Sequence, residues 1–201
     1  SSPLYIQITR GCEDTCNHDF SHNIKPTVVA YSLPPITLGS SLTCSPIKVI
    51  TLPDNRWNNC DVKSIALLGN ILLRQQGKLE NAEEVLLIRE SGYIVEGTTS
   101  NYFIVKNNII ITPPLNNELL PGITRKIILE LCDKNNIALQ EQNITLEDIL
   151  NADEVWLSSS TKEVRPVGQV NHTIINQATP GTTWHKIATL YINHIKNILN
   201  S

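Results

Sequence analysis

The sequence predicts a mixed α and β fold (α/β with α+β character), built from short strands, hairpins and a few amphipathic helices. Short apolar runs alternate with period two between turn residues, as in residues 4–9 and 102–105, which is typical of strands. Apolar residues at helical spacing recur in residues 64–72 and 183–199, and each run predicts one apolar helix face. No internal repeat or low-complexity segment interrupts these patterns, which favours globular domains.

Composition argues against several classes of partner. The 201 residues carry 16 Lys and Arg against 19 Asp and Glu, a net charge of −3 without a basic run, so neither nucleic acid nor a membrane is an expected partner. No apolar stretch approaches a membrane span, and we expect no signal peptide. The five scattered cysteines are typical of a reducing cytoplasm, so we expect a cytoplasmic protein.

A metal site is not predicted. Cys12 and Cys16 lie close to His18 and His22, which are all residue types that bind zinc. No second cysteine pair or spaced histidine pair completes a tetrahedral set, so the four residues do not indicate a zinc site.

The first region is predicted to hold two strands joined by a loop. Residues 5–9 and 25–31 have strand patterns, and the polar residues 11–23 lie between them. The run at 4–9 resembles one member of a sheet whose partners lie elsewhere, and the chain contains no methionine. We therefore expect an N-terminal portion of this region to be missing.

A turn-rich stretch, Leu33-Pro34-Pro35 followed by Gly39-Ser40-Ser41, is the expected linker between two domains. Residues 1–38 are then predicted to be the C-terminal part of a small domain, including the start of the linker. Residues 39–201 are predicted to be a second, larger domain.

The larger domain is predicted to alternate strands and helices. Predicted strands cover residues 47–52, 85–89, 93–95, 102–105, 109–111, 137–144 and 154–157. One predicted helix begins near Ser64, and a second is opened by Leu120–Arg125 and runs to about Asn135. A short third helix runs from Thr145 to Ala152 behind a capping box with Asp148 in place of Glu, and the last begins near Thr183. The turns Ser91-Gly92 and Asn107-Asn108 predict two hairpins.

Four separated features share one kind of chemistry. Lys63 lies just before the predicted helix at Ser64, where the positive helix end favours a neutral amine that can form a Schiff base. Glu96 ends a predicted hairpin and could accept a hydrogen bond from a protonated ring nitrogen. Gly122-Ile123-Thr124 opens a helix and offers amides to an anion, and Ser159-Ser160-Thr161 offers hydroxyls.

Each feature alone also has an ordinary structural explanation: a solvated lysine, a strand-end carboxylate, a helix cap and a polar turn. Together, a lysine imine, an acid for a pyridinium and a phosphate cup are what pyridoxal phosphate (PLP) requires of a protein.

The same motifs, in order, resemble the class IV (fold type IV) PLP aminotransferases, which include D-amino acid and branched-chain aminotransferases and aminodeoxychorismate lyase. The motifs are Asp61–Ser64, Glu96–Asn101, Leu120–Arg125 and Ser159–Val167. Within the class the chain is most similar to D-amino acid aminotransferase, through Tyr5–Gly11, Arg56-Trp57 and Cys60–Ser64. The resemblance implies a two-domain PLP enzyme that binds the cofactor between its domains and forms a homodimer.

The resemblance also implies a role for each matching residue. Lys63 would bind PLP as an imine and move the proton between substrate Cα and cofactor C4′, and Glu96 would keep the pyridine nitrogen protonated. Ile123 and Thr124 would bind the phosphate through backbone amides, and the hydroxyls of Thr124 and Ser160 would assist.

Three further residues complete the implied cofactor site. Leu120 would pack against one face of the ring, and Ser100 and Thr161 would line its polar edge. The implied reaction is transamination of an amino acid, D-alanine-like in the most similar group, with a 2-oxo acid.

One loop departs from the D-amino acid pattern. There, the loop after Arg-Gly of the first strand carries an arginine and a histidine for the substrate carboxylate. Here His18 is the candidate histidine, no arginine accompanies it, and Glu13 and Asp14 would repel a carboxylate. Two alternatives therefore stay open: an aminodeoxychorismate lyase, which eliminates pyruvate to leave 4-aminobenzoate, and a protein that keeps the fold without turnover.

Overall fold

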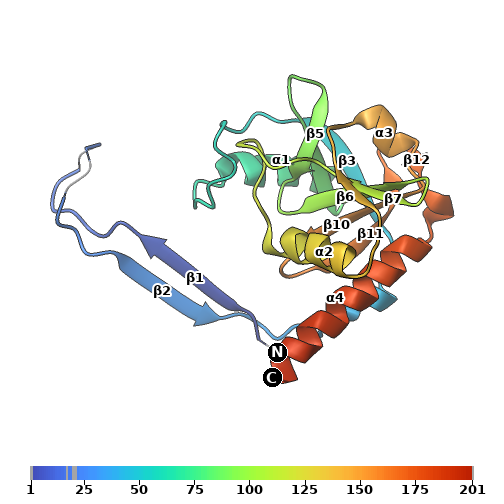
Figure 1. The fold of residues 1–201 in the computed structure, drawn as a ribbon. Coiled ribbons are helices and arrows are strands. Elements are labelled where there is room, and N and C mark those ends of the chain that lie inside the picture. Colours follow the sequence, from blue (N-terminus) through green and yellow to red (C-terminus); the bar gives the residue numbers. More distant parts are fainter. Residues whose placement is uncertain (1, 17, 20–21, 201) are drawn as a thin grey trace. The chain divides into compact units, whose positions relative to one another are not determined.

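The structure, a computed structural model, describes every residue except 1, 17, 20, 21 and 201. The described chain divides into two compact units, residues 1–38 and 39–201 (Figure 1). That these units are part of a small domain and a complete cofactor domain stays a prediction.

The first unit is an antiparallel hairpin of β1 (Leu4–Thr9) and β2 (Thr27–Ser32). The expectation that β1 belongs to a sheet with partners elsewhere is wrong in one respect, since β1 pairs with β2 along its whole length. The rings of Tyr5 and Tyr31 stack across the pair with centroids 4.9 Å apart. No residue described in these two strands is fully buried, and a lone two-stranded hairpin is marginally stable in water.

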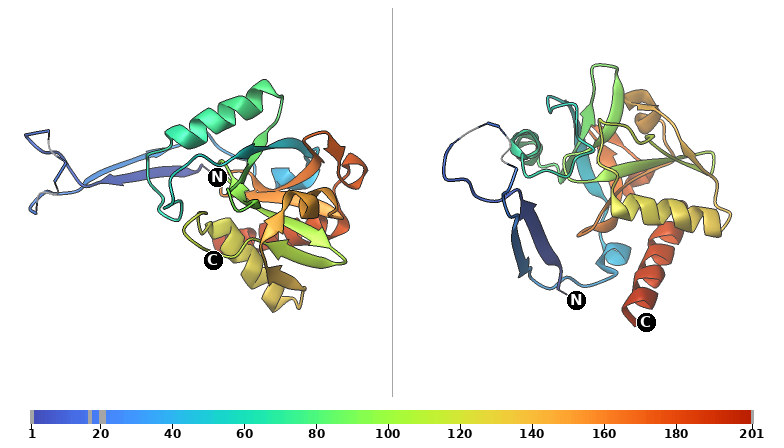
Figure 2. Two further views of the ribbon diagram at one scale, coloured as in Figure 1. Left: turned by 90° about the horizontal axis from the view of Figure 1, so that it is seen from above. Right: turned by 60° about the vertical axis from the view of Figure 1, so that its left-hand side comes forward.

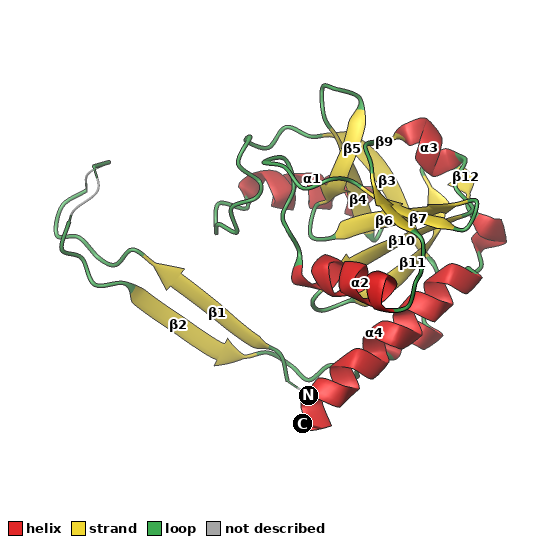
Figure 3. Ribbon diagram, viewed as in Figure 1, coloured by secondary structure: helices red, strands yellow, loops and turns green. Residues whose placement is uncertain are grey.

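The second unit is built around a ten-stranded mixed sheet (Figure 3). The sheet order is β8-β7-β6-β10-β11-β3-β4-β5-β9, with β12 paired to β11. The strands are β3 (Ile47–Pro53), β4 (Glu84–Ile88), β5 (Tyr93–Gly97), β6 (Asn101–Lys106), β7 (Ile109–Thr112), β8 (Leu139–Glu141), β9 (Ile144–Thr145), β10 (Glu154–Ser159), β11 (Glu163–Val170) and β12 (Thr173–Ile174). The helices are α1 (Leu68–Leu79), α2 (Ile123–Lys134), α3 (Leu146–Leu150) and α4 (Thr182–Asn200), with short 3₁₀ turns η1 (Ser40–Thr43) and η2 (Asn176–Ala178).

The sheet curls back on itself. β5 and β6 are separated by four strands in the sheet order but by only three residues in the chain. Gly97 N donates to Ser100 O at 2.7 Å, and the buried Tyr102 hydroxyl donates to Ile94 O at 2.9 Å. The curl therefore brings the carboxyl end of β5 next to the start of β6, where the candidate site forms.

Apolar side chains fill the inside of this curl and both covered outer faces. The inner cluster includes Val49, Leu86, Tyr102 and Leu157, and a second cluster lies under α1 around Leu73. Helix α1 packs on β3 and β4, whereas α2 and α4 pack on each other and on β10 and β11 (Figure 2). None of the helices in the described part of the chain combines the length and apolarity that crossing a membrane requires.

Several local predictions are confirmed at residue level. The capping box at Thr145 forms, because its side chain accepts from Asp148 N while the Asp148 carboxylate accepts from Thr145 N. Asn107 and Asn108 both adopt positive φ, of 50° and 63°, as a tight hairpin turn between β6 and β7 requires.

One strand prediction is wrong, and one strand was not predicted. The run 137–144 forms two short strands, because Gln142 and Asn143 interrupt it: β8 pairs with β7 at one end of the sheet order and β9 with β5 at the other. Strand β11 was not predicted, because Pro166 and Gly168 lie within it. It pairs with β10 on one side and β3 on the other, with a register shift between Val167 and Gln169.

The predicted helix at Ser64 begins four residues later, at Leu68. Its anticipated buried face is instead exposed: Leu68 retains 69% of its accessible surface and Ile71 60%. The residues of α1 that contact the core are Leu73 and Gly77. The apolar spacing in residues 64–72 therefore indicates the exposed apolar face of α1, and not the face of α1 that packs on the sheet.

Candidate functional site

Three segments meet around Asn101, the first residue of β6. The β6–β10 register places Asn101 opposite Ser158, so loop 98–100 and turn 159–162 lie at the same edge of the sheet. Asn101 Nδ2 donates to Leu120 O at 2.9 Å, which attaches the start of α2 to this edge. A Cβ at position 122 would overlap Asn101 Oδ1, so a larger residue there would displace the Asn101 side chain. The segments carrying Ser100, Ser160 and Thr161, and Leu120 with Ile123 and Thr124, therefore converge.

The N-terminus of α2 is open to an anion. Gly122, its N-cap residue, makes no side-chain cap hydrogen bond, and the first turn contains no acidic residue. The N–H groups of a first helical turn lack partners within the helix and attract negative charge. Ile123 is exposed, and Ser160 and Thr161 lie exposed in the β10–β11 turn. The Ser158 hydroxyl is buried without a hydrogen-bond partner among the described residues, which leaves another donor beside this cup.

Thr124, the second residue of α2, is buried beside Tyr191 of α4. Burial raises the pKa of Tyr191, and the neighbouring Thr124 side chain opposes that rise. The role of Thr124 toward a phosphate stays a prediction.

Glu96 is a buried carboxylate at the end of β5. Its Oε1 accepts from Arg56 Nη1 at 2.8 Å, and its Oε2 accepts from Leu120 N at 3.0 Å. Each oxygen has a second lone pair, so the carboxylate can still accept a hydrogen bond from a ring N–H. Burial raises the pKa of Glu96 to about 7, and Arg56 and the Leu120 N–H limit the rise.

This pKa predicts a pH dependence of folding stability without any ligand. The rise from 4.5 to about 7 makes the folded state bind a proton that the unfolded state has lost. The Glu96 contribution is therefore full below pH 4.5 and falls by about 3 kcal/mol as the pH rises to 7. Denaturant unfolding of the parent and Glu96→Gln at pH 5 and 7.5 should show the variant gaining relative stability at the higher pH. Equal differences at both values would contradict it.

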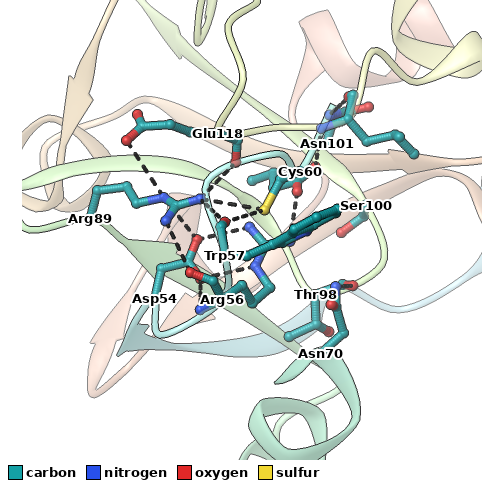
Figure 4. Close-up of polar contacts among 12 residues, drawn as sticks. Asp54, Arg56, Trp57, Cys60, Asn70, Arg89, Thr98, Ser100, Asn101 and Glu118 are labelled. Atoms are coloured by element: carbon teal, nitrogen blue, oxygen red, sulfur yellow. Dashed lines mark hydrogen bonds and ion pairs between the residues drawn. The ribbon is translucent and has the colours of Figure 1, made fainter. Parts of the chain in front are cut away.

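Arg56, which donates to Glu96, belongs to a network of buried charges with Asp54 and Arg89, and Figure 4 shows these three side chains. Asp54 Oδ1 accepts from Arg56 Nε at 2.9 Å, and Asp54 Oδ2 accepts from Arg56 Nη2 at 2.8 Å. Arg89 Nε lies 3.1 Å from Asp54 Oδ2 as an ion pair. Burial tends to lower the pKa of Arg56, but Asp54 and Glu96 outweigh it, so the pKa is raised and the guanidinium stays charged. The sequence suggested Arg56 only through the family resemblance, and neither Asp54 nor Arg89 was predicted.

Lys63 lies in the segment between β3 and α1, residues 54–67, which we call the lysine segment. The prediction that Lys63 is at a helix N-terminus is wrong, because α1 begins five residues later. Lys63 is exposed, and its amine makes no hydrogen bond or ion pair with the residues that the structure describes. Arg56 of the same segment connects it to Glu96.

Glu84, a residue that the sequence did not indicate, holds loop 98–100. Its carboxylate is fully buried and accepts hydrogen bonds from the hydroxyls of Thr98, Thr99 (2.7 Å) and Ser100 (3.2 Å). Lys162 Nζ of the β10–β11 turn lies 4.0 Å from Oε2. Glu84 therefore connects two of the segments that converge at Asn101.

Glu84→Gln should destabilise the fold by about 2–3 kcal/mol, since hydrogen bonds to a charged group are among the stronger ones. Burial raises the pKa of Glu84, but hydrogen bonds from Thr98, Val85 N and Thr99 and the charge of Lys162 outweigh it and lower the pKa. The stabilisation is thus present above pH 4.5 and lost as the pH falls through the folded-state pKa.

Denaturant unfolding at pH 7 and pH 4 measures this effect. The matched control is Glu83→Gln, the neighbouring glutamate, whose side chain is 61% exposed. Equal stability of the two variants at pH 7 would show that the Glu84 hydrogen bonds contribute little.

His18 belongs to the first unit, in the segment between β1 and β2, where it is exposed. Its role toward a substrate carboxylate stays a prediction.

Comparison with known proteins identifies close relatives. A family model described as "Amino-transferase class IV" matches residues 2–170. A D-alanine aminotransferase of Bacillus licheniformis is 37% identical over 192 residues, which cover 96% of this chain and 67% of that protein.

Solved structures share the fold. One described as a 4-amino-4-deoxychorismate lyase from Legionella pneumophila superposes with a TM-score of 0.83 at 22% identity, over 96% of this chain and 69% of that one. The branched-chain amino acid aminotransferase of Thermobaculum terrenum in its PLP form superposes with a TM-score of 0.81 at 20% identity, over 96% of this chain and 64% of that one. The chain thus spans about two thirds of the length of these relatives and has their fold.

Proposed function

The chain belongs to the class IV aminotransferases, and on that premise we propose that it catalyses PLP-dependent transfer of an amino group between an amino acid and a 2-oxo acid. The observation that supports this most directly is the convergence of a buried carboxylate, Glu96, with the uncapped N-terminus of α2 and the hydroxyl-bearing turn 159–162. A carboxylate for a ring nitrogen and a binding site for a phosphate then lie at the same end of neighbouring strands.

The described residues fit the cofactor. A phosphate fits the N–H groups at the start of α2 and the Ser158 hydroxyl, which has no partner among the described residues. A pyridinium fits Glu96, which can accept one more hydrogen bond. PLP, when bound, supplies an electron sink for charge that develops on the substrate Cα.

Each residue then has a task. The Lys63 amine provides the covalent attachment point and carries the proton to and from the substrate Cα. Glu96, which accepts a hydrogen bond from Arg56, would keep a proton on the ring nitrogen. Leu120, whose N–H donates to the Glu96 carboxylate, would pack on one face of the ring.

The remaining residues bind and orient. The N–H groups of Ile123 and Thr124 and the hydroxyls of Thr124 and Ser160 would bind the phosphate. Ser100 and Thr161 would line the polar edge of the ring.

We propose a D-alanine-like amino donor, because the curated relatives that match most of this chain are D-alanine aminotransferases. The test supplies D-alanine and 2-oxoglutarate to the protein with PLP and measures pyruvate and glutamate. L-alanine and L-leucine in parallel define chirality and side-chain preference. Pyruvate released from aminodeoxychorismate without any amino acceptor would instead assign the lyase, and no turnover with any of these would assign a non-catalytic protein.

We also propose a homodimer formed through the exposed apolar face of the lysine segment and α1. Ile65, Leu68, Ile71 and Leu72 each expose about half of their surface or more. Large contiguous apolar patches on soluble proteins mark interaction sites.

Leu72→Glu should raise the dimer Kd on the order of 10²-fold or more, because an unpaired buried carboxylate costs about 3–5 kcal/mol. Sedimentation velocity over a dilution series measures this. The control is Leu115→Glu, which changes an exposed leucine in the loop between β7 and α2. A parent protein that is already monomeric, or a dimer unaffected by Leu72→Glu, would refute the proposal.

A cytoplasmic location agrees with the five cysteines. All five lie in the described part of the chain, and all are free thiols. Free thiols persist in reducing compartments.

A further inference from the structure

Arg89 projects from a rigid base at the end of β4. Arg89 N donates to Tyr93 O at 2.9 Å, and Gly92 N donates to Arg89 O at 2.8 Å, so the β4–β5 hairpin turn fixes its backbone. The side chain retains only 7% of its accessible surface. A buried guanidinium with a fixed backbone has few alternative positions.

The Arg89 guanidinium donates mainly to the lysine segment (Figure 4). It donates to Trp57 O at 3.2 Å, to Asn58 Oδ1 at 3.2 Å and to Cys60 Sγ at 3.4 Å. Its Nε forms the ion pair with Asp54 at the start of the same segment. The guanidinium also donates to Arg56 O at 3.5 Å, so one side chain contacts five positions of a segment that contains no regular helix or strand before α1.

Arg89 also contacts the segment that precedes α2. It donates to Glu118 O at 3.4 Å, two residues before the Leu120 N–H that holds Glu96. Asn117 of this segment is bonded to the lysine segment as well: Cys60 N donates to Asn117 O at 2.8 Å, and Asn117 Nδ2 donates to Asn58 O at 2.6 Å. Arg89 therefore lies between the segment of Lys63 and the support of Glu96.

We propose that Arg89 is a positioning residue that sets where the Lys63 amine lies relative to Glu96. The proposal rests on the proposed function of Lys63. The connection is short: Val62 N donates to Asn59 O at 3.2 Å, so a tight turn leads from Cys60 directly to Lys63. Only a planar guanidinium, with five donors in a fixed fork, serves carbonyls, an amide and a thiol at once, which a lysine ammonium does not.

The test separates covalent attachment from phosphate and ring binding. The parent and Arg89→Lys are titrated with PLP and with pyridoxine 5′-phosphate, which lacks the aldehyde. Arg89→Lys should slow attachment at Lys63, followed by absorbance and borohydride trapping, on the order of 10²-fold, as expected for a reacting group displaced by about 1 Å. Its affinity for pyridoxine 5′-phosphate should stay that of the parent.

A second measurement needs no cofactor. In the chain without PLP, amide hydrogen exchange of a peptide covering residues 56–64 should be faster in Arg89→Lys than in the parent. Arg125→Lys is the matched control, since Arg125 is also buried but pairs with Pro113 O and Glu141. Asn58→Ala, which removes a single exposed acceptor of Arg89, should give a smaller change in the same direction.

The outcomes are distinct. Equal losses for PLP and pyridoxine 5′-phosphate, or unchanged attachment with unchanged exchange, would overturn the role of Arg89. A parent protein that PLP does not label at Lys63 would refute the proposed function instead. In that case, faster exchange at 56–64 in Arg89→Lys would still show that Arg89 fixes the lysine segment.

Discussion

Lys63→Ala should abolish covalent attachment of PLP and lower the transamination rate by at least about 10⁴-fold, the upper end of what one positioned acid–base group contributes. The substitution removes both the proposed attachment point and the proposed carrier of the proton at the substrate Cα. Because Lys63 is exposed and its amine has no partner among the described residues, the fold should be unaffected. Borohydride reduction followed by peptide mapping measures attachment, and single-turnover kinetics measure the rate.

The control for this experiment is Lys78→Ala, which removes an exposed lysine in the last turn of α1. It should retain the parent rate and the parent label. A label on a lysine other than Lys63 in the parent, or a Lys63→Ala protein that turns over normally, would remove Lys63 from the site.

Glu96→Gln should leave the cofactor bound but slow proton transfer at the substrate Cα on the order of 10²-fold, the effect of losing one preorganised electrostatic partner. The Glu96 carboxylate accepts a hydrogen bond from Arg56 of the lysine segment and another from Leu120 N, just before α2. It therefore connects these two segments. A neutral amide stabilises a protonated ring nitrogen less than a carboxylate does. The rate with Cα-deuterated substrate isolates the affected step.

Glu90→Gln is the matched control, an exposed glutamate in the turn of the same β4–β5 hairpin. It should behave like the parent in cofactor affinity and in rate. A Glu96→Gln protein with the parent rate would mean that another group protonates the ring. Loss of cofactor affinity without loss of rate would mean that Glu96 only binds.

The local elements could be predicted because short-range chemistry specifies them. The Asn107-Asn108 turn needs two residues that tolerate positive φ, and the Thr145 capping box needs one hydroxyl and one carboxylate three residues apart. The order of the motifs around Lys63, Glu96 and Thr124 was likewise sufficient to predict the family.

Non-local pairing decided what periodicity could not. Strand β11 contains Pro166 and Gly168, yet neighbours on both sides stabilise it in the sheet. The apolar spacing after Lys63 describes one helix face correctly but does not say whether that face is covered, and in this structure it is exposed.

The sequence by itself predicted which residues carry the chemistry, and the tertiary structure decided which contacts hold their segments. Arg56 lies 40 residues from Glu96 in the chain, and Arg89 lies 31 residues from Asn58. Nothing in the local pattern around Asp54, Glu84 or Arg89 distinguishes them from solvated charges. They became recognisable only when the curled sheet buried them, because a buried charge is stable only with partners that the rest of the fold supplies.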